Sequence, residues 1–69
     1  MSKDLHMNLY DLIERMTIHL RNFLSLDQQS QVNFALNLLT NTKSTDAELE
    51  EQLTILNQIV SSIPNASFS

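Results

Sequence analysis

The stretch from Thr45 to Pro64 has a regular apolar pattern that constrains the fold of the whole chain. Apolar residues recur in it at alternating steps of four and three, namely Leu49, Leu53, Leu56, Val60 and Ile63. This spacing places all five side chains on one face of an α-helix. Thr45 and Glu48 have the spacing of a capping box at the start of the helix, and Pro64 marks its end. We therefore predict a helix over 46–63 with one apolar side.

Two earlier segments have the same helical character. Residues 4–24 carry a stripe made of Leu5, Leu9, Leu12, Ile13, Met16, Leu20, Phe23 and Leu24. Ser25 and Gln28 form a second potential capping box, and a stripe of Val32, Ala35, Leu36 and Leu39 follows it. These patterns predict helices over 4–24 and 26–40. Because the chain has no glycine, we expect Asn41 to end the second helix in the left-handed conformation.

The predicted fold is therefore all-α, a small three-helix domain that comprises residues 1–69, with 64–69 as a short tail. Each predicted helix also carries large apolar residues outside its main stripe: Met7, Ile18, Phe34, Leu38, Ile55 and Ile59. A chain of this length buries only about 60% of the surface that it exposes when unfolded. We predict that these six residues form an interface, and that the chain is a homodimeric helical bundle. The sequence leaves open whether they bind a second copy or another protein, and whether some are merely scattered surface residues.

The composition excludes several kinds of chemistry. Without glycine there is no phosphate-binding loop and no dinucleotide fingerprint, and without cysteine there is no disulfide, thiolate metal site or thiol nucleophile. His6 and His19 do not have the spacing of a helical metal pair. We expect no enzymatic activity, no cofactor and no metal. The sequence has no long apolar run and no signal peptide, so we expect a cytoplasmic protein with no membrane partner.

The charge pattern bears on the choice of partner. The formal net charge is −4, and four carboxylates crowd the start of the last predicted helix: Asp46, Glu48, Glu50 and Glu51. Carboxylates at this position complement the helix dipole. Alternatively, they form an acidic patch that docks on a basic protein surface, such as that of a transcription regulator. The four basic residues are too scattered to bind phosphates, so we expect no direct contact with nucleic acid.

These observations predict a small non-enzymatic protein-protein interaction module. A regulator of the antirepressor, anti-activator or adaptor type fits best, one that occludes or captures its partner through an apolar helical face. One alternative is a minimal helix-turn-helix protein that binds nucleic acid through its second and third helices. Another is a structural subunit or chaperone with no regulatory role.

Overall fold

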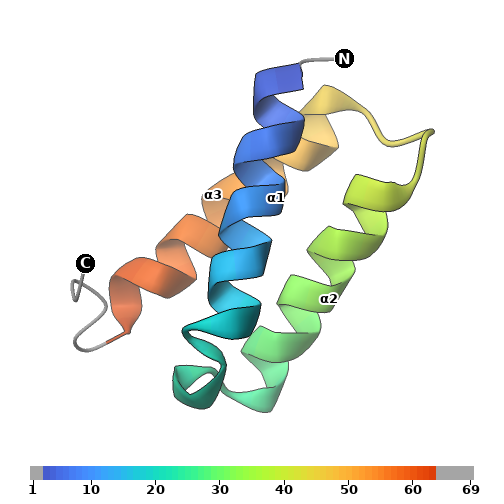
Figure 1. Cartoon of the computed structure of the whole chain (residues 1–69). Helices are drawn as coiled ribbons and strands as arrows, with labels where there is room; N and C mark the ends of the chain where they lie inside the picture. The colour runs from blue at the N-terminus through green and yellow to red at the C-terminus, as the bar shows by residue number, and fades with distance from the viewer. Residues whose placement is uncertain (1–2, 64–69) are drawn as a thin grey trace.

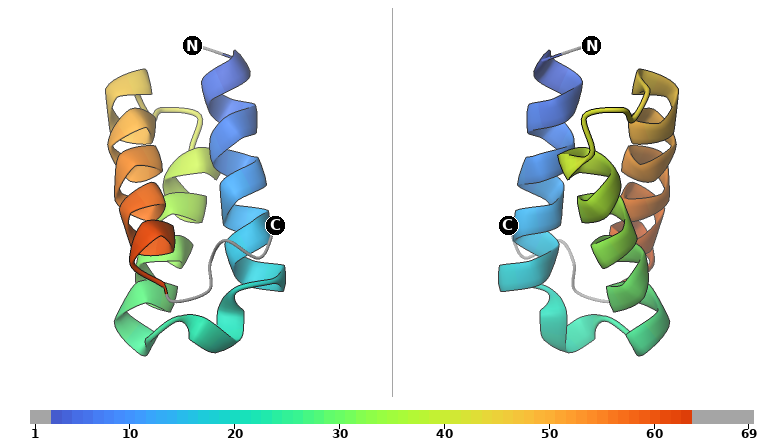
Figure 2. Two further views of the ribbon diagram at one scale, coloured as in Figure 1. Left: turned by 90° about the vertical axis from the view of Figure 1, so that its left-hand side faces the viewer. Right: turned by 90° about the vertical axis from the view of Figure 1, so that its right-hand side faces the viewer.

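The computed structural model describes residues 3–63 of the chain. This part folds into three α-helices, α1 (Lys3–Ile18), α2 (Leu26–Thr40) and α3 (Asp46–Ser62), and a short 3-10 helix, η1 (Arg21–Phe23). Consecutive helices run in opposite directions, and each packs against the other two (Figures 1 and 2). The predicted all-α fold with three helices is confirmed. The predicted tail, 64–69, lies outside the described residues.

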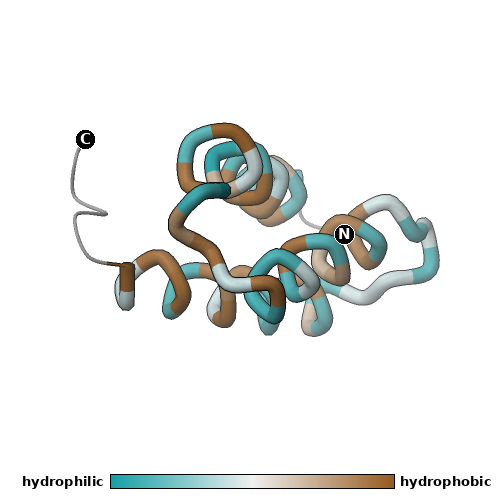
Figure 3. Tube along the Cα trace, turned by 90° about the horizontal axis from the view of Figure 1, so that it is seen from below, coloured by the Kyte–Doolittle hydropathy of each residue, from teal (hydrophilic) through white to brown (hydrophobic). Residues whose placement is uncertain are grey.

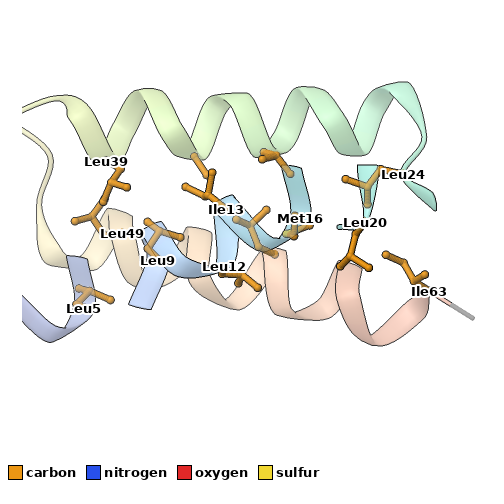
Figure 4. Packing of buried hydrophobic residues seen from close by; sticks show 13 residues of the cluster. Leu5, Leu9, Leu12, Ile13, Met16, Leu20, Leu24, Leu39, Leu49 and Ile63 are labelled. Atoms are coloured by element: carbon orange, nitrogen blue, oxygen red, sulfur yellow. The ribbon is translucent and has the colours of Figure 1, made fainter. Parts of the chain in front are cut away.

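The core occupies the space between the three helices. It consists of Leu5, Leu9, Leu12, Ile13, Met16, Leu20, Leu24, Val32, Ala35, Leu39, Leu49, Leu56 and Ile63. Figure 4 shows these side chains converging between the ribbons. All of them belong to the predicted stripes. Of the other stripe residues, Leu53 and Val60 are half-buried at the edge of the core, whereas Phe23 and Leu36 are exposed.

The first helix is shorter than the sequence predicts, because α1 ends at Ile18 and not at residue 24. A helix that continued to Leu24 would leave only Ser25 to reverse the chain before α2. Connections between packed helices usually need two to eight residues. The chain therefore leaves the helix and passes through η1 to an extended Leu24, with φ −97° and ψ 137°. Leu20 and Leu24 still reach the core from this connector.

Both predicted capping boxes are present. The Ser25 hydroxyl accepts a hydrogen bond from the Gln28 N–H (3.1 Å), and the Gln28 side chain accepts one from the Ser25 N–H (2.9 Å). The Thr45 hydroxyl accepts from the Glu48 N–H (3.2 Å), and the Glu48 carboxylate accepts from the Thr45 N–H (2.8 Å). These bonds satisfy backbone donors that the first turn of each helix leaves unpaired.

The prediction for Asn41 is wrong, because its backbone is extended, with φ −86° and ψ 118°. Its side-chain oxygen accepts a hydrogen bond from the Lys43 N–H (2.9 Å), which makes an Asx turn. The buried Ser44 hydroxyl then donates to the Leu38 carbonyl (2.6 Å), which also accepts a hydrogen bond from the Asn41 N–H (3.3 Å). Two polar side chains thus shape the turn, so no residue with positive φ is needed at this helix end.

Candidate protein-protein interface

The six residues predicted to form an interface lie on two different faces of the structure. Met7 and Ile18 lie on the outer side of α1, where 57% and 64% of their surfaces are exposed. They are eleven residues apart in the sequence, which is about three helical turns, so they project in nearly the same direction. That direction is opposite to the buried Leu9 and Met16. We call this surface the outer face of α1.

The other four residues lie on the side where α2 and α3 run next to each other. A hydrogen bond from the Gln31 side-chain amide to the Gln52 side-chain oxygen (2.7 Å) joins the two helices and shows which residues lie opposite each other. Phe34 and Leu38 follow Gln31 by three and seven residues, and the other two follow Gln52 by the same steps. Steps of three and seven keep side chains on one side of a helix. We call this surface the α2–α3 face, formed by Gln31, Phe34, Leu38, Gln52, Ile55 and Ile59.

The residues of the α2–α3 face differ in how much they contribute to the core. Leu38 and Ile59 are half-buried and pack against core residues, and Ile55 is also half-buried. Phe34 is 52% exposed. The hydropathy view in Figure 3 shows apolar positions recurring along each helix between polar ones. The apolar side chains of this face therefore extend from the edge of the core to the solvent.

Gln52 is a residue whose position the sequence analysis missed. Only 3% of its surface is exposed, and it lies in the buried stripe of α3 with Leu49, Leu56 and Ile63. Its spacing from Leu49 and Leu56, three and four residues, is a signal that could have revealed its position. A buried amide is stable only when it is hydrogen-bonded, and Gln31 provides the bond.

The structure separates the four residues of the predicted acidic patch into two pairs. Glu48 and Glu51 precede Gln52 and Ile55 by four residues each, so they project on the side of α3 that faces α2. Asp46 and Glu50 precede Leu49 and Leu53 by three and four residues along the other side. Glu48 also accepts two hydrogen bonds from Thr45, so it is part of a helix cap. The four carboxylates do not share one side of the helix.

A hollow between α1 and the end of α2 was also missed. It is lined by His6, Met7, Tyr10, Asp11, Leu39, Thr40, Asn41 and Thr42. Tyr10 is half-exposed here and extends the apolar surface that begins at Met7. The sequence signal was the spacing of three residues between Met7 and Tyr10, which places them one turn apart.

Two properties of the described residues bear on other functions. Within residues 3–63, no group of three or more histidine, aspartate or glutamate side chains is arranged to hold a metal ion. None of the helices in this range combines the length and the hydropathy that crossing a bilayer requires.

Comparison with protein-family models, with curated proteins and with solved structures finds no match to this chain.

Proposed function

We propose that this chain is a small non-enzymatic interaction protein that binds another protein through an apolar helical face. It acts as a regulator of the antirepressor, anti-activator or adaptor type, and it works by covering or capturing a functional surface of its partner. The observation that carries this proposal is the set of large apolar side chains left exposed in the described structure. They are Met7, Tyr10, Ile18, Phe23, Leu26, Phe34 and Leu36.

Seven large apolar side chains are exposed among the described residues. Isolated apolar residues are normal on any protein, whereas neighbouring ones rimmed by polar groups are typical of binding sites. On the α2–α3 face, Phe34 lies one turn from the half-buried Leu38 and three residues from the uncharged, half-buried Gln31. Uncharged polar groups cost less to remove from water than ions do. A partner can therefore cover this surface at a low cost in desolvation.

The proposal is tested by capturing partners from an extract of the native cells with the tagged protein and two variants. Phe34→Asp places a charge at the most exposed apolar residue of the α2–α3 face, and we expect it to abolish capture of a discrete partner. Asn33→Asp adds the same charge to the same helix, next to α1, and we expect it to retain the partner. Circular dichroism should show that both variants keep their helices.

Two outcomes would contradict the proposal. One is that no protein is captured in stoichiometric amount by the wild-type chain. The other is that Phe34→Asp and Asn33→Asp capture the same proteins to the same extent, because the apolar surface would then have no part in binding.

A further inference from the structure

We propose that the α2–α3 face binds a basic amphipathic helix of the partner protein. This inference rests on the proposed function and gives it a chemical class of partner. It follows from three features: the distribution of charge, the shape of the apolar surface, and the positions of two carboxylates beside it.

The charges of the chain are segregated between its helices. α2 and α3 contain no lysine or arginine and carry five of the eight carboxylates, so together they have a formal charge of −5. The rest of the chain holds all four basic residues and three carboxylates, a formal charge of +1. The acidity of the molecule is therefore concentrated in the two helices that form the α2–α3 face. Asp46 and Glu50 project along the other side of α3, and the remaining carboxylates of these two helices attract a basic partner to the α2–α3 face.

The apolar side chains cross the α2–α3 face along a diagonal. α2 and α3 are antiparallel (Figure 1), so steps of three and seven residues lead in opposite directions from the hydrogen-bonded Gln31 and Gln52. Phe34 and Leu38 lie about 4.5 and 10.5 Å toward the 41–45 connector, measured along the helix axis. On α3, Ile55 and Ile59 lie at the same two distances from Gln52, but in the direction away from the 41–45 connector. The diagonal thus spans roughly 20 Å, the length of a helix of about 14 residues.

Carboxylates occupy the other diagonal of the same face. Asp27 precedes Gln31 by four residues on α2, and Glu48 precedes Gln52 by four residues on α3. Both side chains are exposed, and a step of four keeps each of them on the side of its glutamine. The apolar diagonal is therefore bordered by a negative charge on each flank. Its complement is a helix with an apolar stripe that has lysine or arginine on both sides.

The same two carboxylates argue against a second copy of the chain as the occupant. Apolar contact between two α2–α3 faces would bring Asp27 and Glu48 of one copy close to those of the other. Like charges at an interface cost several kcal/mol. Nucleic acid is excluded by the same repulsion, because its phosphates are also negative. A helix suits the surface because an amphipathic helix can lay its apolar side against an apolar helical face.

The test uses a displayed library of helical peptides and does not require the natural partner. Every peptide has the same four-turn apolar stripe, and the positions on both sides of the stripe vary among lysine, glutamate, glutamine and serine. Selection on the wild-type protein should enrich lysine on both sides. Enrichment of glutamate, or no preference among the four residues, would overturn the proposal.

Binding of the selected peptide to variants locates the site. Measured by fluorescence anisotropy, Phe34→Asp should weaken binding at least tenfold, and Asp27→Asn should weaken it severalfold and reduce its dependence on salt. Met7→Asp, on the outer face of α1, should leave binding unchanged. Equal binding by a peptide of the same composition with a scrambled stripe would overturn the proposal, because charge alone would then explain the attraction.

The proposal and the function on which it rests fail in different ways. If lysine is not enriched while capture of a cellular partner still depends on Phe34, the interaction function stands and the basic helix is wrong. If the selected peptide binds at the α2–α3 face while no cellular partner is captured, the face recognises basic helices and the regulatory function is wrong.

Discussion

At the scale of single residues, the pair of Gln31 and Gln52 is the feature that most shapes the surface. Gln52 is buried among leucines, and its side-chain oxygen is bonded to Gln31. An apolar contact tolerates several registers, whereas a buried hydrogen bond is satisfied in only one. The pair therefore favours one shift of α3 along α2. This shift determines where Phe34 and Ile55 lie on the α2–α3 face.

Removing Gln31 should destabilise the protein more than removing both glutamines. Gln31→Ala leaves the buried Gln52 oxygen without its donor, and we expect the free energy of unfolding to fall by about 1–3 kcal/mol. The double variant Gln31→Leu with Gln52→Leu leaves no unpaired polar group, so it should lose less. Urea unfolding of the three proteins measures this difference. A double variant less stable than Gln31→Ala would contradict this expectation. It would show that the hydrogen bond stabilises the fold by more than the burial of the two amide groups destabilises it.

At the scale of the elements, α2 and α3 begin at side-chain caps, and polar side chains shape the turn between them. Ser25 and Thr45 cap α2 and α3 through reciprocal bonds with Gln28 and Glu48. In a chain without glycine, Asn41 and Ser44 complete the turn between these helices through side-chain hydrogen bonds. The ends of α2 and the start of α3 therefore depend on hydrogen bonds from a few polar side chains and not on apolar packing in the core.

Loss of either cap should cost about 1 kcal/mol of stability. Ser25→Ala and Thr45→Ala each leave helix N–H groups without an acceptor. Ser30→Ala is the matched control, because Ser30 is exposed within α2 and alanine has the higher helix propensity. We expect a lower urea midpoint for the two cap variants and an equal or higher one for the control. If Ser30→Ala lowered the midpoint as much as Ser25→Ala, the caps would not be the cause.

The sequence predicts those features that depend on residues close together in the chain. The caps of α2 and α3 involve residues only three apart, so their spacing reveals them. The end of α1 depends on the space that the chain needs to reverse before α2, and the apolar spacing of Leu20 and Leu24 conceals that need. The candidate interface was predictable as a set of apolar residues outside the main stripes. Its division into two faces was not, because it depends on how the three helices pack, which brings together residues as far apart in the sequence as Gln31 and Gln52.

At the scale of the whole molecule, the two faces differ in charge and so suit different partners. The α2–α3 face has carboxylates on both flanks of its apolar residues. The outer face of α1 has charges of both signs near Ile18, including Glu14 and Arg15. Two copies can therefore meet at this face without strong repulsion. We propose that the chain forms a homodimer through Met7 and Ile18 and leaves the α2–α3 face open to another protein.

Sedimentation equilibrium tests this division of the two faces. The wild-type chain should sediment as a dimer, and Met7→Lys combined with Ile18→Lys should make it a monomer. Phe34→Asp should leave the dimer intact, because Phe34 lies on the α2–α3 face. A wild-type protein that is monomeric over the whole accessible concentration range would show that no homodimer forms. The proposal would be contradicted if Phe34→Asp abolished the dimer while the α1 variant kept it. Self-association would then occur through the α2–α3 face.

The segregation of basic residues also determines how the protein can be labelled or immobilised. Its two lysines, Lys3 and Lys43, lie at the start of α1 and in the connector after α2. Amine-reactive dyes and surface coupling reagents therefore leave the side chains of α2 and α3 unmodified. Lys43 is exposed in the connector after α2, so coupling through it leaves Phe34 and Ile55 chemically unmodified.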